Sequence, residues 1–370
     1  MILPIIYIIL FIYLIYFIWI IEPLFKKDEI LISNYNPFIS IVISAKNESN
    51  NIPLLLESLQ KQTYPLDKYE IIIANDGSKD DTLTQLIHAQ NKISNLFVID
   101  IKKTPTNWGS KKWALNKCFH KSKGEIIIQT DADCIHPSAW VFNTVQIFQN
   151  QNIGLVCGAS YIGKKNIFWD QILKFESLAQ ESFTYANAKR NLFLSCTARN
   201  IAFRKKVFEE INGYDNISHI DSGDDDLLLH KIVTLTDYEI KFLANKNILV
   251  SSNSPQTIKE LLLQRLRYAS KGILYYKLET PKEVKIILPF LIIANVASAF
   301  SIISFIIFQN YIWLIPFILK IFSDIILILK YMEKLNISFN IIYFIILMVI
   351  HPFYMITFGL IAPFTKVQWK

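Results

Sequence analysis

The stretch from Ile2 to Ile21 contains no charged residue. A membrane-crossing helix needs about 20 apolar residues, so this stretch is long enough to span a bilayer. It is too long for the apolar part of a cleaved signal peptide, and no small-residue cleavage site follows it. Lys26 and Lys27 come next, and lysines beside a span favour the cytoplasmic side. We expect residues 1–24 to form an N-terminal transmembrane helix that leads into the cytoplasm.

A second apolar region begins near Ile286 and is uncharged as far as Phe308. The next apolar segment, Tyr311 to Leu329, is interrupted by Lys320 and Asp324. These two residues lie four apart on a helix, which fits two arrangements. They neutralise each other inside a helical bundle, or the lysine extends along the helix to reach the membrane surface.

The last apolar segment, Ile341 to Ala362, carries His351 and Pro352 near its middle. Proline inside a span indicates either a kinked helix or a re-entrant hairpin. We therefore expect residues 283–365 to form a C-terminal transmembrane region of two to three spans or one re-entrant segment. Residues 366–370 are a tail whose side of the membrane stays open.

The composition supports a membrane protein with one soluble domain. Hydrophobic residues make up 52% of the chain, which is more than an ordinary soluble domain contains. The net charge of +7 fits nucleic acid, an anionic membrane surface or phosphorylated substrates. No basic repeat or aromatic-basic module points to nucleic acid, so we expect no nucleic-acid partner. The four cysteines are scattered without a CxxC pair, which predicts lone thiols in a reducing compartment.

Residues 28–282 alternate between short Ile/Val-rich runs and amphipathic helical patterns. This alternation predicts an α/β domain with a mainly parallel sheet and right-handed crossovers. The expected strands are Phe38–Ser44, Tyr69–Ala74, Leu96–Ile101 and Glu125–Gln129. The expected helices between and after them are Asn51–Gln62, Thr82–Gln90 and Ser110–Lys121.

Acidic residues follow three of these strands: Glu48, Asp76, and the pair Asp131 and Asp133. Ligands of parallel α/β sheets bind at the carboxyl ends of the strands, so these side chains share the expected binding edge. Asp131 and Asp133 lie two apart in a turn and can both reach one divalent cation, for which carboxylates favour Mg²⁺ or Mn²⁺. The same pair also fits a capped turn before the helix near Pro137.

The other acidic motifs each have two interpretations. Asp76-Gly77-Ser78 is a good strand-to-helix turn, and Asp76 could also accept hydrogen bonds from a base or ribose. Asn47-Glu48 is likewise a helix entry or a nucleoside contact. Gly223 is followed by three aspartates, Asp224 to Asp226. They suit the first turn of a helix over Asp224–Thr236, and a carboxylate among others also suits a general base.

A basic motif, Gln264-Arg265-Leu266-Arg267-Tyr268, follows these acidic ones. Arg267 can clamp a diphosphate with two parallel hydrogen bonds, and Tyr268 offers a flat face for a sugar ring. A surface helix with Arg265 and Arg267 facing lipid phosphate is the alternative.

These motifs, in this order, resemble those of family 2 glycosyltransferases, which are membrane-associated enzymes with the GT-A fold. The resemblance runs from about Phe38 to Tyr276, and the flanking apolar segments match the membrane-bound members. It implies a Rossmann-like α/β domain for nucleotide-diphospho-sugars, flanked by transmembrane helices. It also implies inverting transfer of a sugar from a nucleotide-sugar to an acceptor hydroxyl, with Mg²⁺ or Mn²⁺ as cofactor.

On the donor side, the resemblance assigns Glu48 and Asp76 to the nucleoside. Asp131 and Asp133 would touch the ribose and diphosphate through the metal. Lys111, in the segment GSKKWALN, matches a family lysine near the donor. The pyrophosphate contacts would come from Gln264 and Arg267.

For catalysis, Asp225 matches the base of the family, and a shift of one position would select Asp224 instead. On the acceptor side, the resemblance implies Thr197 and Asn200, within SCTARNIAFRK. Tyr268 stands where the family has Trp and would still stack on a sugar. The helical stretch Phe168–Arg190 either guides a lipid acceptor at the membrane surface or is a packing helix.

We therefore expect an integral enzyme of the cytoplasmic (plasma) membrane, with its catalytic domain in the cytoplasm. Its acceptor would be a lipid or a glycan, in synthesis of cell-envelope polysaccharide or glycolipid. A nucleotide-sugar-binding sensor or scaffold without catalysis is one alternative, although it would have no need of the three aspartates. A nucleotidyltransferase is another, but Ala45 to Asn51 lacks the glycines of a phosphate-binding loop.

Overall fold

The computed structural model describes residues 2–26, 34–163 and 167–365. Lys27 and the predicted tail 366–370 lie outside the described residues. The chain forms two compact units that are interleaved in sequence. We call residues 34–163 and 195–253 the globular unit, and residues 2–26, 167–194 and 254–365 the helical unit.

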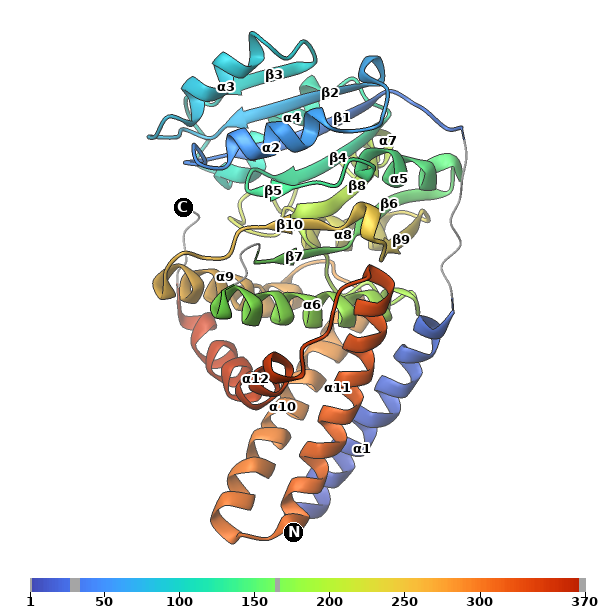
Figure 1. Cartoon of the computed structure of the whole chain (residues 1–370), viewed down its shortest axis with the longest axis vertical. Coiled ribbons are helices and arrows are strands. Elements are labelled where there is room, and N and C mark those ends of the chain that lie inside the picture. Colours follow the sequence, from blue (N-terminus) through green and yellow to red (C-terminus); the bar gives the residue numbers. More distant parts are fainter. Residues whose placement is uncertain (1, 27–33, 164–166, 366–370) are drawn as a thin grey trace. The chain divides into compact units, whose positions relative to one another are not determined.

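The globular unit is built on a seven-stranded sheet with the order β3-β2-β1-β4-β8-β6-β9 (Figure 1). A second, three-stranded sheet has the order β5-β10-β7. The strands of the large sheet are β1 (Ile39–Ala45), β2 (Tyr69–Asn75), β3 (Leu96–Asp100), β4 (Ile126–Asp131), β6 (Ile153–Gly158), β8 (Ile201–Arg204) and β9 (Glu239–Leu243). Those of the small sheet are β5 (Cys134–Ile135), β7 (Ser160–Ile162) and β10 (Val250–Ser252).

The four strands expected from the sequence are present and parallel to one another. The expected helices are also present, with ends within two residues of the predicted ones. The helices of this unit are α2 (Ile52–Gln60), α3 (Thr82–Gln90), α4 (Ser110–Lys121), α5 (Trp140–Gln146), α7 (Lys205–Glu210) and α8 (Asp226–Leu235). The sheet is mixed, however, because β8 runs antiparallel to both β4 and β6.

Both faces of the parallel strands are buried, which explains their nearly continuous Ile/Val runs. Ile41 of β1 faces the same side as Leu55 and Leu59 of α2, within the main hydrophobic cluster. Side chains alternate along a strand, so Val42 faces the opposite side, where α4 packs against β1 and β2. Helices thus cover both faces, and Asp131 is partly exposed at the edge formed by the carboxyl ends of the strands.

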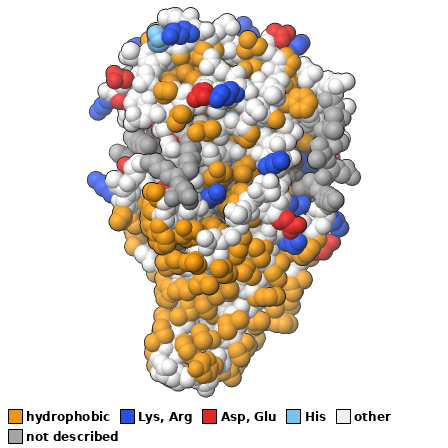
Figure 2. All heavy atoms as spheres, in the orientation of Figure 1, with side chains coloured by type: hydrophobic (Ala, Val, Ile, Leu, Met, Phe, Trp, Pro, Cys, Tyr) orange, Lys and Arg blue, Asp and Glu red, His pale blue; other side chains and the backbone are white. Residues whose placement is uncertain are grey.

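The helical unit contains four helices that are long and apolar enough to cross a membrane, by length and composition. The helices of this unit are α1 (Ile2–Ile21), α6 (Phe168–Ala188), α9 (Ile258–Lys277), α10 (Lys282–Phe308), α11 (Leu314–Leu335) and α12 (Ile341–Ile361). Of these, α6 and α9 are the two that are not candidate spans. Figure 2 shows hydrophobic side chains gathered over the surface of the apolar helices, as expected for segments that lie in lipid.

Two questions left open by the sequence are answered in this unit. Lys320 and Asp324 are both buried and form an ion pair of 2.7 Å, and Tyr13 of α1 donates to the same carboxylate at 2.6 Å. Of the two arrangements that the sequence left open, mutual neutralisation inside the bundle is the one observed. The segment around Pro352 forms one continuous helix, α12, so it is not a hairpin.

All four cysteines are buried free thiols, as predicted. Burial raises the pKa of the Cys118 thiol to about 12, which keeps it protonated and unreactive.

Candidate active site

The acidic motifs meet at the carboxyl end of the parallel strands. In the β1–β2 register Ala45 pairs with Asn75, and in the β1–β4 register Ser44 pairs with Asp131. The residues that follow β1 and β2, including Glu48 and Asp76, therefore leave the sheet at the same edge as Asp131. The sequence-based expectation of a shared edge is confirmed by this register.

Glu48 and Asp76 are held by local contacts. The Glu48 carboxylate accepts from the Asn51 side chain at 2.6 Å, and its amide donates to Thr82 Oγ1 at 2.8 Å. Asp76 is buried and accepts from Ser110 Oγ at 2.7 Å, and Lys46 Nζ lies 3.5 Å from the same oxygen. Both residues serve as turn and helix-entry residues in this structure. Their nucleoside contacts stay predictions.

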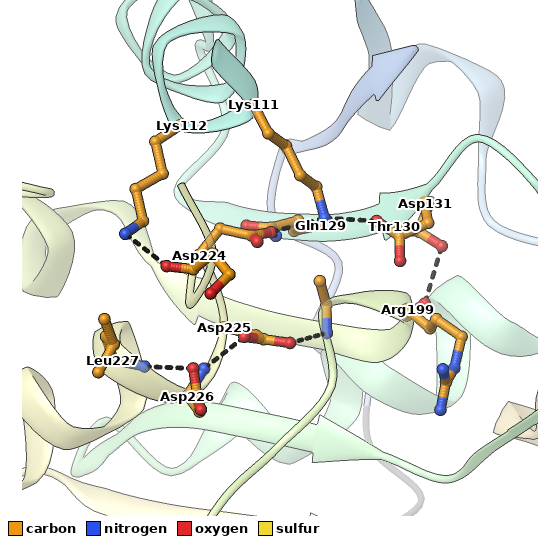
Figure 3. A network of polar contacts seen from close by, with 12 residues as sticks. Lys111, Lys112, Gln129, Thr130, Asp131, Arg199, Asp224, Asp225, Asp226 and Leu227 are labelled. Atoms are coloured by element: carbon orange, nitrogen blue, oxygen red, sulfur yellow. Dashed lines mark hydrogen bonds and ion pairs between the residues drawn. The ribbon is translucent and has the colours of Figure 1, made fainter. Parts of the chain in front are cut away.

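Lys111 is the centre of the polar network drawn in Figure 3. Its ammonium lies 2.8 Å from Asp131 Oδ1 and 2.8 Å from Asp224 Oδ2. Gln129 also donates to Asp224 Oδ2, at 2.9 Å. One lysine on α4 thus joins the aspartate that ends β4 to the first aspartate of the acidic triplet.

The charges of this network stabilise one another. Burial alone would lower the pKa of the Lys111 ammonium, but the carboxylates of Asp131 and Asp224 outweigh it and raise that pKa above its usual value. Burial alone would raise the pKa of the Asp224 carboxyl, but Lys111, with a contribution from Lys112, lowers it below its usual value. Asp224 is therefore an ionised carboxylate committed to an ion pair, which makes it a poor proton acceptor.

Asp225 and Asp226 cap helix α8, as the helix-start interpretation predicted. Asp225 is the N-cap residue, and its carboxylate accepts from the amides of Asp226 at 2.8 Å and Ala198 at 3.0 Å. Asp226 is fully buried and accepts from the amide of Leu227 at 2.9 Å. Gly223, just before the triplet, has φ of 81°, which L-residues with a side chain rarely adopt. Of the three aspartates, Asp225 alone is partly exposed.

Asp131, the last residue of β4, and Asp133, in the turn that follows, are both partly exposed. Within the described ranges no cluster of three His, Cys, Asp or Glu side chains is arranged to hold a metal. Two carboxylates at an open edge nevertheless fit Mg²⁺ or Mn²⁺, because these ions are often held by one or two carboxylates together with phosphates and water. The donor set therefore fits a metal that binds together with a phosphorylated ligand.

The two predicted acceptor residues of the globular unit have different environments. Thr197 Oγ1 lies 3.1 Å from Ser160 Oγ. The Asn200 side chain is buried, accepts from Trp140 Nε1 at 2.8 Å, and donates to the carbonyls of Ala159 and Ile248. Its observed role is to tie these segments together, and its contact with an acceptor stays a prediction.

Gln264, Arg267 and Tyr268 lie on α9 of the helical unit. Tyr268 is 37% exposed, and the Arg267 guanidinium lies 5.6 Å from its ring centre. Arg265, between them, is buried and pairs with Glu176 of α6 at 2.6 Å. The alternative in which Arg265 faces lipid phosphate is therefore wrong.

Sequence reasoning missed two residues of the network, Gln129 and Lys112. Gln129 is fully buried in β4. The sequence signal for it was a polar residue that directly follows three isoleucines of a predicted buried strand. Lys112 shares the buried face of α4 with Leu115 and Phe119, three and seven residues later. A lysine at such helical spacing among apolar residues indicates a buried charge with dedicated partners.

Comparisons with known proteins bear on the family and the fold of this chain. Residues 40–212 match the family model described as glycosyl transferase family 2. Glycosyltransferase AglE of Haloferax volcanii is 24% identical over 245 residues, which are 66% of this chain and 75% of that protein. Beta-monoglucosyldiacylglycerol synthase of Trichormus variabilis is 34% identical over 134 residues, which are 36% of this chain but 28% of that protein.

A solved structure covers nearly the whole chain. It is the mannosyltransferase PcManGT from Pyrobaculum calidifontis in complex with GDP-Man and Mn²⁺. The TM-score is 0.59 at 18% identity, over 98% of this chain and 97% of that one. At this identity the similarity concerns the fold, and the predicted GT-A domain with flanking apolar helices is confirmed.

Proposed function

We propose that the chain is a member of glycosyl transferase family 2, whose family model matches residues 40–212, and that it moves a sugar from a nucleotide-diphosphate-sugar to an acceptor hydroxyl with inversion. The observation that carries the proposal is the Lys111 bridge. It brings the acidic turn after β4 and the acidic triplet before α8 together at one edge. Such an edge is where α/β sheets bind nucleotides and their phosphates.

In the proposed reaction, Asp225 takes the proton of the acceptor hydroxyl. The oxygen then attacks the anomeric carbon from the side opposite the diphosphate, the carbon–oxygen bond to the diphosphate breaks, and the nucleoside diphosphate leaves. Asp225 suits this role better than Asp224, because Asp224 is buried and paired with Lys111. A correctly placed general base contributes about 10²- to 10⁴-fold to the rate.

The diphosphate gains negative charge as it leaves, and cations at the edge would stabilise it. Lys111 is one such cation, and its raised pKa keeps it charged at neutral pH. Mg²⁺ or Mn²⁺ held by Asp131 and Asp133 would supply further positive charge there. For Gln264 and Arg267 of α9, pyrophosphate contacts are proposed by analogy with the family motif alone.

The remaining assignments are proposals of the same kind. Glu48 and Asp76 would contact the nucleoside, and Thr197, Asn200 and Tyr268 would line the acceptor side. The four candidate spans support an integral membrane protein. We propose a lipid or glycan acceptor and a role in cell-envelope polysaccharide or glycolipid synthesis at the cytoplasmic face. The exposed Phe168 and Trp169 at the start of α6 support contact of that helix with the membrane surface.

The experiment that tests the function uses detergent-purified protein and a panel of UDP- and GDP-sugars with Mn²⁺ or Mg²⁺. The measurement is release of nucleoside diphosphate, with and without a membrane lipid extract. We expect release from one donor that stops on chelation of the metal and in Asp133→Ala. Absence of release from every donor, with lipid extract present, would contradict the proposal.

A further inference from the structure

The segment between α7 and α8 delivers the acidic triplet to the site. It makes close contact with the start of α4. The amide of Gly109 donates to the Ser218 carbonyl at 2.8 Å. A side chain at Gly109 would place its Cβ only 2.9 Å from the Ile220 carbonyl oxygen, so the segment lies directly on this turn of the chain.

Lys112 extends from the first turn of α4 into this segment. Its side chain is fully buried, and its ammonium donates to three main-chain carbonyls, those of Ile217 at 2.7 Å, Ile220 at 3.0 Å and Ser222 at 2.9 Å. An ammonium has three N–H donors, so it can bond to three carbonyls at the same time. The loop therefore encloses the Lys112 ammonium. These three hydrogen bonds fix the backbone from residue 217 to residue 222.

The first turn of α4 therefore contacts three acidic segments of the globular site: the turn after β2, the end of β4 and the acidic triplet. Ser110 donates to Asp76, Lys111 pairs with Asp131 and Asp224, and Lys112 holds the residues just before Asp224. Lys112 differs from Lys111 because it donates hydrogen bonds to three main-chain carbonyls of one segment. Of these two adjacent lysines, Lys111 pairs with acids of the site and Lys112 holds the backbone that leads to Asp224.

We propose that Lys112 is a positioning residue for sugar transfer, whose ammonium holds residues 217–222 so that Asp224 and Asp225 keep their places in the site. The proposal rests on the proposed function, since it assumes that Asp225 accepts the proton. Gly223 lies between the anchored Ser222 and Asp224. The φ and ψ angles of glycine are less restricted than those of other residues, so Gly223 does not hold the acids in place by itself. Without the anchor the triplet would shift, and a displacement of about 1 Å in a reacting group can cost about 100-fold in rate.

The chain offers a matched control in Lys231 of α8. This lysine is also buried and also donates to main-chain carbonyls, those of Gly213 at 2.7 Å and Asp215 at 2.9 Å. It holds the beginning of the same segment, several residues away from the acids. Loss of a buried lysine as such should affect both positions, whereas loss of positioning should affect Lys112 alone.

The test compares Lys112→Met and Lys231→Met in the full-length protein in detergent. With the nucleotide-sugar that the wild-type protein turns over, we expect Lys112→Met to lower kcat by about 10- to 100-fold with the donor KM changed by less than about 3-fold. We expect Lys231→Met to retain most of the wild-type kcat. Hydrogen exchange measured by mass spectrometry should show faster exchange over residues 217–222 in Lys112→Met only.

Equal losses of kcat in the two variants, at equal losses of thermal stability, would overturn the proposal, because Lys112 would then be an ordinary buried lysine. Unchanged exchange over residues 217–222 in Lys112→Met would overturn it independently of any activity. If the wild-type protein turns over no donor, the proposed function fails, and the role of Lys112 in transfer fails with it. The exchange result then still reports whether Lys112 holds the segment.

Discussion

Each unit of the molecule buries a lysine beside an acid. The two arrangements differ in the number of carboxylates that contact the lysine and in how exposed those carboxylates are. In the helical unit, Lys320 pairs with one carboxylate, Asp324, which Tyr13 also contacts, and all three are buried. In the globular unit, Lys111 is shared by two carboxylates, and the Asp131 side chain is 28% exposed.

Charge balance and solvent exposure therefore distinguish a structural ion pair from a candidate binding site. The Lys320–Asp324 pair lies within α11, is buried, and is joined to α1 through Tyr13, so it holds an apolar bundle together. Two acids around one lysine leave negative charge at an open edge, where a divalent cation and its phosphates can bind. The following predictions test that distinction, beginning with the largest expected effect.

The largest effect is expected for Asp225→Asn. Loss of the base should lower transfer by about 10²- to 10⁴-fold, while donor affinity stays close to that of the wild-type protein. Steady-state kinetics and donor titration measure the two quantities. Asp226→Asn is the matched control, because it removes the same charge from a buried aspartate of the same triplet. Full activity in both Asp225→Asn and Asp224→Asn would remove the proposed base.

Lys111→Met should have the next largest effect, this time on stability as well as activity. It leaves Asp224 buried without its main cation, and breaking a buried ion pair costs about 3–5 kcal/mol. Thermal unfolding followed by tryptophan fluorescence measures the loss. Lys117→Met, on the same helix, removes a lysine that lies 4.2 Å from the Trp113 ring centre and should cost about 0.5–1 kcal/mol. Similar losses in the two variants would show that the Lys111 pairs contribute little.

The helical unit should respond differently to removal of a complete pair. Asp324→Leu alone leaves Lys320 buried and unpaired and should destabilise the protein by about 3 kcal/mol. The double change Lys320→Met with Asp324→Leu should recover most of that stability and keep transfer activity. The corresponding double change in the globular unit, Lys111→Met with Asp224→Leu, should abolish transfer. Loss of activity in the helical-unit double variant at wild-type stability would contradict the structural role of that pair.

The smallest effect is expected in the pH dependence of stability. The Asp224 pKa is lowered on folding, so its contribution is fully present above the unfolded pKa of about 4 and is lost as pH falls through the folded value. The Lys111 pKa is raised, so its contribution is present below about pH 10 and is lost only in strong alkali. As far as these two groups are concerned, the midpoint of thermal unfolding should therefore not change with pH between about pH 4 and about pH 10. Asp224→Asn should reduce the loss on the acid side, and an unchanged acid limb would contradict the ion pair.

Much of this protein was predictable from local sequence. The uncharged run Ile2–Ile21 and the later apolar segments identify the candidate spans, because length and hydropathy alone decide whether a helix suits a bilayer. The Ile/Val runs and helical patterns of residues 38–129 predict strands and helices, because both faces of parallel strands must be apolar. Acidic residues directly after these strands predict the binding edge.

Other features depended on tertiary structure. The antiparallel strand β8 between β4 and β6 pairs residues far apart in the chain, which no local pattern specifies. From the sequence, the family resemblance selected Asp225 as the base and left Asp224 as the alternative, without a physical distinction between the two. Folding separates the three aspartates by partner: Asp224 pairs with Lys111, Asp226 is buried as a cap, and Asp225 stays partly exposed.

Sequence by itself therefore determined the membrane segments, the α/β class and which residues are charged at the edge. These follow from hydrophobic periodicity, which is a property of neighbouring residues. Tertiary structure alone decided what each charge does, because the pKa and the accessibility of a carboxylate depend on the partners that the fold brings to it. The two lysines of the first turn of α4 show this most directly, since neighbours in sequence are directed to acids in one case and to main-chain carbonyls in the other.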